Sequence, residues 1–131
     1  MSTLRNSNRY IKTVINFDKM NNDFGGAYRF VAQRPYKGKS EAGLEPGATV
    51  TLQIIKDTAP PVIDKETGME MDNNVFQTFD ATIVGTKYPL PFAKGDYVAL
   101  NGFIPEASYY INFNFILRFK EIKLLKAAQK G

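Results

Sequence analysis

Short runs in which apolar and polar residues alternate recur along this chain, and they restrict its fold more than any other feature. In 49–56, for example, Val50, Leu52 and Ile54 alternate with threonine and glutamine. Successive side chains of a β-strand point to opposite faces, so such a run buries one face and exposes the other. Clusters of glycine, proline and asparagine separate the runs, and helical periodicity is nearly absent. The sequence therefore predicts an all-β fold.

The strands predicted from this pattern cover most of the chain. They are 10–17, 27–34, 49–56, 75–84, 96–104 and 109–125. The pattern leaves open which of the first two segments provides the first strand of the sheet. The last segment is long for one strand, so we expect it to bend or break near Leu117–Arg118. Between 49–56 and 75–84, two prolines and an acidic, turn-like segment predict a long β-hairpin.

The alternation also predicts which aromatic side chains lie on the outer faces of strands. In 96–104 it assigns Val98 and Leu100 to the core, and Tyr97 and Phe103 to the solvent. Exposed rings side by side reduce solubility unless a ligand, a second copy of the chain or another segment covers them. The aromatic residues that we predict to face outward are Phe76, Tyr97, Phe103 and Tyr110, with Tyr28 and Phe30 as candidates from the first strand.

Charge and aromatic residues are distributed unevenly, and in the same way. Residues 1–40 contain eight basic and two acidic residues, 41–80 contain two and eight, and 81–131 contain seven and three. Fifteen of the seventeen aromatic residues lie in the two basic segments. Rings interleaved with cations suit a single nucleic acid strand, because bases stack on rings and phosphates pair with cations. Aromatic residues that simply build a core give the same composition, so the pattern must decide between these interpretations.

The composition argues against several classes of protein. The 131 residues suffice for one domain, and no apolar run reaches the length of a membrane span. The chain has no cysteine, which excludes disulfides and thiolate metal sites, and no histidine, the commonest general base near neutral pH. The first residues lack the apolar core of a signal peptide, so we expect a soluble, cytoplasmic protein. We expect no enzymatic activity, no membrane association, no cofactor and no metal.

Two short motifs point to ligands, but each lacks a required residue. Gly38-Lys39-Ser40 resembles the end of a phosphate-binding loop, but Gln33 stands where that loop needs its first glycine. The acidic residues of 64–72 have the composition of a calcium loop, but Met69 stands where its glycine is required. A solvated hairpin tip explains these acidic residues better.

The turns and strands of 49–125 follow a recognisable order. One strand closes on Gly85, a Lys94-Gly95-Asp96 turn leads into the next strand, which bends at Gly102, and 117–124 forms a closing strand. This order resembles the OB-fold, in particular that of the single-stranded-DNA-binding proteins of bacteria and their phages, including the compact type of lactococcal phages. Two departures accompany the resemblance: the chain has no tryptophan, and its last residues are basic where the bacterial family has an acidic tail. Phenylalanine and tyrosine would therefore have to stack the bases.

The resemblance implies a five-stranded Greek-key barrel of the OB type with an N-terminal extension and a long β-hairpin. The whole chain, 1–131, would form one domain, with a basic N-terminal segment at 1–47 and the barrel core at about 27–125. It also implies sequence-independent binding of single-stranded DNA in DNA replication or recombination, in the host cytoplasm where a bacteriophage encodes the protein. A homo-oligomer and contacts with replication or recombination proteins are left open.

The binding expected from this interpretation combines phosphate electrostatics with base stacking on the six outward rings. The cations expected to contact phosphates are Arg29, Arg34, Lys37, Lys39, Arg118 and Lys120. Two alternatives are compatible with the same sequence. One is a phage structural or protein-interaction β-barrel module whose exposed rings meet another protein, and the other is an RNA-binding OB domain.

Overall fold

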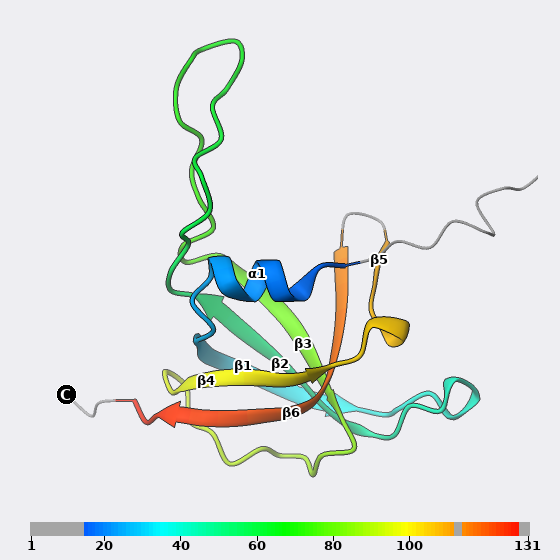
Figure 1. Ribbon diagram of the computed structural model, residues 1–131. Coiled ribbons are helices and arrows are strands. Elements are labelled where there is room, and N and C mark those ends of the chain that lie inside the picture. The colour runs from blue at the N-terminus through cyan, green and yellow to red at the C-terminus, as the bar shows by residue number, and fades with distance from the viewer. Residues whose placement is uncertain (1–14, 112–113, 129–131) are drawn as a thin grey trace, which may run out of the picture.

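Strands dominate the structure of this chain, and its helical elements are short (Figure 1). A computed structural model describes residues 15–111 and 114–128. The helical elements are α1 (Phe17–Asp23) and two 3-10 turns, η2 (Ser40–Ala42) and η3 (Pro105–Ala107). The strands are β1 (Tyr28–Tyr36), β2 (Gly47–Ile54), β3 (Thr78–Val84), β4 (Tyr97–Phe103), β5 (Tyr109–Ile111) and β6 (Asn114–Lys126). The prediction of a predominantly β fold is confirmed.

The six strands form one sheet, and five of them close into a ring. Neighbouring strands follow the order β3-β2-β1-β4-β6-β5, and an additional pairing between β3 and β6 joins the two sides. The β3–β6 pairing is parallel, whereas the other pairings are antiparallel. Strand β5 pairs with the first residues of β6 and lies outside the closed part of the sheet. The ring itself therefore consists of β1, β2, β3, β6 and β4.

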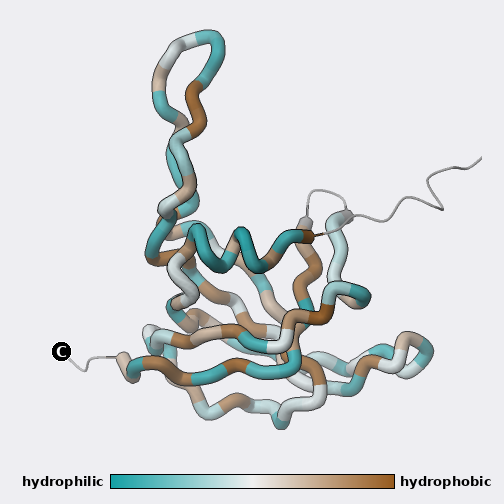
Figure 2. The backbone as a smooth tube through the Cα atoms, viewed as in Figure 1, coloured by the Kyte–Doolittle hydropathy of each residue, from teal (hydrophilic) through white to brown (hydrophobic). Residues whose placement is uncertain are grey.

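The interior of the ring is the hydrophobic core. Several of the residues that alternation assigned to the core are buried there, namely Val50, Leu52, Ile54, Ala81, Ile83, Val98 and Leu100. Figure 2 shows that hydrophobic residues recur along the strands of the ring, whereas α1 and the tip of the β2–β3 connection are mostly hydrophilic. Each fully buried valine, leucine or isoleucine side chain contributes about 1.5–3 kcal/mol through removal of apolar surface from water.

The first strand of the sheet is β1, which answers the question that the sequence left open. It pairs with β2 from Tyr28 to Tyr36 and with β4 near Tyr28. Of the alternative segment 10–17, residues 10–14 lie outside the described residues. The end of that segment is not a strand, because Phe17 begins helix α1.

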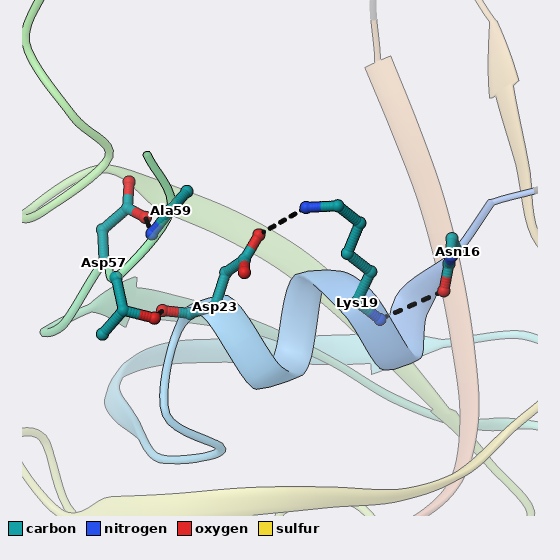
Figure 3. A network of polar contacts seen from close by, with 6 residues as sticks. Asn16, Lys19, Asp23, Asp57 and Ala59 are labelled. Atoms are coloured by element: carbon teal, nitrogen blue, oxygen red, sulfur yellow. Dashed lines mark hydrogen bonds and ion pairs between the residues drawn. The ribbon is translucent and has the colours of Figure 1, made fainter. Parts of the chain in front are cut away.

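Local interactions explain why α1 forms although the sequence shows little helical periodicity. The Asn16 Oδ1 atom caps the helix by accepting a hydrogen bond of 3.0 Å from the backbone N–H of Lys19 (Figure 3). One turn later, Lys19 Nζ lies 3.0 Å from Asp23 Oδ2. The buried ring of Phe17 packs edge-on against Phe119, with 4.8 Å between centroids. At seven residues the helix is too short to give a periodic signal in the sequence. Among the described residues no helix combines the length and apolar content needed to cross a bilayer.

The connection between β2 and β3, residues 55–77, projects from the ring as an arm (Figure 1). Its two sides run antiparallel, with one isolated bridge between Ile63 and Glu70. Strand β3 begins at Thr78, three residues later than the predicted 75–84. The later start has a local cause, because the backbone of Phe76 adopts a left-handed conformation with φ of 72° that interrupts an extended strand.

Polar contacts fix the base of the arm to α1 (Figure 3). Thr58 donates two hydrogen bonds to the backbone carbonyl of Asp23, from its N–H (2.7 Å) and from its hydroxyl (2.9 Å). The Asp57 carboxylate accepts hydrogen bonds from the backbone N–H groups of Asn74 (2.9 Å) and Ala59 (3.0 Å), which lie on opposite sides of the arm. These two N–H groups lower the pKa of Asp57 because they stabilise its ionised form.

Strand β4 bends near its end, and the bend reverses the predicted orientation of Phe103. Gly102 adopts a left-handed conformation with φ of 70°. Beyond it, Phe103 pairs with Phe119 across the β4–β6 ladder, and its ring packs 5.5 Å from that of Phe119 and 5.2 Å from that of Phe17. The prediction that Phe103 faces the solvent is therefore wrong, because strict alternation does not continue through a bend in the backbone.

The predicted strand at 109–125 is divided at a different place from the one expected. Strand β5 ends at Ile111 and β6 begins at Asn114, so the division lies at 112–113, outside the described residues. We expected a bend or a break near Leu117–Arg118, and the break does not occur there, because β6 is continuous through these residues. Figure 1 shows that it curves strongly along its length, which allows it to pair first with β3 and then with β4.

Candidate nucleic-acid interface

A hollow of about 800 Å³ lies over the outer face of the ring, where β1 ends and β6 begins. We call it the sheet-face hollow. Its floor includes the outward-facing residues Thr49, Asp80 and Thr82 of β2 and β3. From β1 and the loop after it come Arg34, Tyr36 and Lys37, and from β6 come Phe115 and Arg118.

A second hollow, of about 510 Å³, lies between the β1–β2 loop and the connection that leads from β4 to β5. We call it the loop hollow. Its charged and aromatic lining residues are Lys39, Glu45, Glu106, Tyr109, Arg118 and Lys120. Arg118 lines both hollows, so the two adjoin at this residue.

Arg118 is buried, although the sequence predicted an exposed cation at this position. Only 6% of the residue is accessible to solvent. The centre of its guanidinium group lies 5.7 Å from the ring centroid of Tyr36 and 5.8 Å from that of Tyr109. Its Nη1 atom donates a hydrogen bond of 2.8 Å to the backbone carbonyl of Ala107, and its backbone N–H donates one of 3.0 Å to the hydroxyl of Ser108. The cation is therefore held in one position by its neighbours.

The two hollows together carry more basic than acidic side chains. The basic residues are Arg34, Lys37, Lys39, Arg118 and Lys120, and the acidic ones are Glu45, Asp80 and Glu106. Asp80 lies 3.0 Å from Arg34 and also accepts a hydrogen bond of 2.8 Å from the hydroxyl of Thr51. The net positive charge of this surface favours an anionic ligand.

Three exposed rings stand on the β5–β6 hairpin: Tyr109, Tyr110 and Phe115. Tyr109 lines the loop hollow and Phe115 the sheet-face hollow, whereas Tyr110 lines, with Phe115, a separate hollow next to α1. Tyr110 and Phe115 face each other across the two strands, with ring centroids 5.1 Å apart. By strict alternation Phe115 would share a face with the buried Leu117, but 52% of Phe115 is exposed. The reason is that Phe115 pairs with β5, outside the ring, whereas the pairing with β3 starts only at Leu117.

Two of the predicted outward rings, Tyr28 and Phe30, are buried in the core instead. Tyr28 donates a hydrogen bond of 2.7 Å to Asn21 Oδ1, and its ring packs edge-on against Phe79. Burial raises the pKa of Tyr28, because the charged phenolate would lose its hydration. Phe30 packs against Phe92, with 5.8 Å between ring centroids. The prediction that these two rings face solvent is wrong, because on β1 the residue between them, Arg29, takes the outward position.

Three further predicted residues lie away from the two hollows. Arg29 and the half-buried Tyr97 are cross-strand neighbours at the end of β1 opposite to Arg34. Phe76 is 73% exposed, as predicted, but it lines a separate hollow beside the acidic arm. The structure does not bring these three residues together with the other predicted cations.

The fold gathers five of the six predicted cations, and it adds rings that the sequence did not identify. The cations are Arg34, Lys37, Lys39, Arg118 and Lys120, and the added rings are Tyr36, Tyr109 and Phe115. Tyr110, the remaining predicted ring, lies beside Phe115 on the same hairpin. Adjacency in sequence could have suggested two of the added rings, because Tyr36 precedes Lys37 and Tyr109 precedes Tyr110.

This surface offers two kinds of group that can bind a ligand. Cations can pair with phosphates, and exposed rings offer flat apolar faces to bases. Within residues 15–111 and 114–128, the acidic side chains form no cluster of three that could hold a metal ion. Asp64, at the tip of the arm, instead accepts hydrogen bonds from the backbone N–H groups of Glu66 and Thr67 and so closes the turn.

Comparisons with known proteins do not assign this chain to a family. No protein-family model matches it, and searches of curated proteins and of solved structures find no match.

Proposed function

We propose that the protein binds single-stranded DNA, without strong sequence preference, along the path formed by the sheet-face hollow and the loop hollow. One observation carries the proposal: five cations surround two adjoining hollows, and the exposed rings of the β5–β6 hairpin stand beside them. An unpaired strand offers both of the groups that such a surface can bind, a charged backbone and free base faces.

The order of the strands supports a finer proposal, that the ring is an OB-type barrel. Around the ring the order is β1, β2, β3, β6, β4 and back to β1, with five strands in the closed part. OB barrels have five strands and bind oligonucleotides on the face of their second and third strands, between the first loop and the loop before the last strand. The two hollows occupy the corresponding places, over β2 and β3, beside the β1–β2 loop, and beside the β4–β6 connection.

Binding would proceed by electrostatic attraction followed by stacking. The exposed lysines attract the phosphate backbone and release its condensed counterions. Bases then stack on rings such as Phe115, each contributing about 1–3 kcal/mol. Duplex DNA offers the same phosphates, but its bases are stacked on one another and cannot reach the rings. This mode tolerates any sequence, because every base has a flat face, and it suits a role in DNA replication or recombination, including that of a bacteriophage.

A fluorescence anisotropy titration tests this proposal. We expect a labelled oligo-dT of about 16 nucleotides, the upper site size for one OB fold, to bind more tightly than a duplex of equal length. Five phosphate contacts predict a slope of log K against log salt of about −3.5 on a single strand, so affinity should fall about a hundredfold between about 50 and 200 mM NaCl. An oligo-U strand of equal length measures any preference for RNA. Absence of binding to oligo-dT at low salt would refute the proposal.

The arm favours a second candidate function, that of a protein-interaction module. Five of its large apolar side chains are exposed, namely Val62, Ile63, Met69, Met71 and Phe76. Such side chains are unusual on a surface that meets only water, and they suit contact with another protein. The same titration separates the candidates, since an interaction module without a nucleic acid site would bind neither oligo-dT nor duplex.

A further inference from the structure

Among the cations of the proposed interface, Arg118 has an unusual environment. The Lys37, Lys39 and Lys120 side chains belong to exposed residues, whereas Arg118 is buried between the rings of Tyr36 and Tyr109. A charge taken out of water normally requires a paired carboxylate, because desolvation costs several kcal/mol. Among the described residues no carboxylate lies within ion-pair distance of Arg118.

The partners of the guanidinium group satisfy only part of it. Its Nη1 atom donates to the carbonyl of Ala107, and the two tyrosine rings face its π system. Its Nε atom is buried and has no hydrogen-bond partner, and the same is true of the hydroxyl of Tyr36. Nearly all buried polar groups in proteins are hydrogen-bonded, so these two donors require an explanation, and a bound anion would provide one.

The free edge of Arg118 has the shape that binds phosphate. One N–H of Nη1 is engaged by Ala107, while the edge formed by Nε and Nη2 keeps two parallel N–H groups with no partner among the described residues. Two parallel N–H groups on one edge of a guanidinium match two oxygens of a phosphate, whereas a lysine offers only a point charge. The carbonyl and the rings already fix the guanidinium, so little side-chain entropy remains to be lost on binding.

We infer that Arg118 is the phosphate-binding centre of this surface, at the point where a strand passes from the sheet-face hollow to the loop hollow. The inference rests on the proposed function for its ligand, a phosphodiester of single-stranded DNA. The chemistry recognised is that of a phosphate group, so inorganic phosphate should occupy the same edge. Because Nε is covered, binding requires a displacement of neighbouring side chains. Of the two rings beside the guanidinium, that of Tyr109 is the exposed one, and it belongs to the three-residue strand β5.

Nuclear magnetic resonance of the arginine side chains tests this in the unaltered protein. The chain has five arginines, so their Nε–H signals are few, and the signal lost in Arg118→Lys identifies Arg118. The protein is titrated first with sodium phosphate against sodium chloride of equal ionic strength, and then with oligo-dT. We expect the Arg118 signal to shift with saturation in both phosphate and oligo-dT, while chloride leaves it unchanged.

The possible results separate the inference from the proposed function. If oligo-dT binds but the Arg118 signal does not move, the inference is wrong and the proposed function stands. If phosphate shifts the signal with saturation but oligo-dT does not bind, the phosphate centre stands and the proposed function is wrong. A phosphate effect that is equal at Arg29, Arg34 and Arg118, or that does not saturate, would overturn the inference.

Variants add a quantitative comparison. Removing a hydrogen bond to a charged group costs about 1.5–3 kcal/mol, so Arg118→Gln should weaken oligo-dT binding about tenfold to a hundredfold. Lys120→Gln removes the same charge from an exposed position in the same hollow, and we expect a loss of about fivefold or less. Arg118→Lys should fall between the two, because it keeps the charge but not the two-pronged edge. Equal losses of affinity in Arg118→Gln and Lys120→Gln would contradict the inference. If Arg118→Gln does not fold, the shifts of the Arg118 signal in the unaltered protein decide the question.

Discussion

Arg34 on β1 and Asp80 on β3 are joined across the intervening strand β2 by an ion pair of 3.0 Å. Both side chains are about half exposed, at 58% and 48%. Exposed pairs of this kind contribute only about 0–1 kcal/mol to stability, because water and salt screen them. The pair has a larger consequence for binding, since Asp80 neutralises one of the cations at the floor of the sheet-face hollow.

Asp80→Asn should therefore tighten the binding of oligo-dT. Releasing Arg34 for a phosphate is worth about 0.2–1 kcal/mol by analogy with exposed ion pairs, which corresponds to about 1.5-fold to 5-fold in affinity. The asparagine oxygen can still accept the hydrogen bond from Thr51, so the free energy of unfolding should change little. Fluorescence anisotropy and urea denaturation measure the two quantities. Asp72→Asn, on the arm, makes the same change of charge away from the sheet-face hollow and the loop hollow, and it serves as control. An equal gain in that variant would show that only net charge matters.

Phe115→Ala should weaken oligo-dT binding while leaving the fold intact. Its ring is half exposed beside the sheet-face hollow, and loss of one stacked base costs about 1–3 kcal/mol. Phe76→Ala is the matched control, because Phe76 is also exposed but lines a hollow beside the acidic arm. We expect its affinity to be unchanged. If Phe76→Ala lost affinity and Phe115→Ala did not, stacking would have to be assigned to the other side of the molecule.

Phe103→Ala should reduce stability rather than remove a stacking surface. The ring packs against Phe17 and Phe119, and truncation of a fully buried phenylalanine costs about 3–5 kcal/mol, so about 2–3 kcal/mol is expected for this partly buried one. Urea denaturation measures the loss, and the folded variant should still bind oligo-dT when assayed well below its melting temperature. Loss of affinity without loss of stability would restore Phe103 to the binding surface.

Asp96→Asn should lower the stability of the protein at neutral pH and make its stability depend less on pH in the acidic range. The carboxylate of Asp96 accepts hydrogen bonds from the backbone N–H groups of Ala93 (2.9 Å) and Ala128 (2.7 Å), which together lower its pKa. Because the pKa of Asp96 is lower in the folded state than in the unfolded state, where it is about 3.9, its ionised carboxylate stabilises the folded state at pH values above about 3.9. This contribution disappears as the pH falls through the folded-state pKa. Thermal unfolding of both proteins from about pH 7 to pH 2 measures the effect. The difference in melting temperature should shrink as pH falls, and a constant difference would exclude a role of ionisation.

Prediction from the sequence was most accurate where a strand is straight and has one buried face. For Val50, Leu52 and Ile54 on β2, alternation alone assigned the core side correctly, because the sheet there is regular. The prediction was wrong for Tyr28 and Phe30, although both rings share one face of the strand and Arg29 and Gln33 mark the opposite face as the polar one. It was also wrong for Phe103, because the bend at Gly102 lies between this residue and the regular part of β4.

The candidate interface was predictable only in part for a similar reason. The cations Arg34, Lys37 and Lys39 are close in sequence and lie near each other in the fold, so their clustering was visible in the chain. Arg118 joins them only through the parallel pairing of β3 with β6, which closes the ring and places Arg118 next to Thr82 of β3. No local pattern encodes such a pairing.

The sequence by itself determined that this protein is built of strands, because the alternation of apolar and polar residues is a local property that any short segment carries. It also determined the separation of basic and acidic segments along the chain. The tertiary structure decided which rings remain exposed and that Arg118 is buried between Tyr36 and Tyr109. These outcomes depend on how distant strands pair and where they bend, since burial is set by the neighbours that the fold supplies and not by the residue alone.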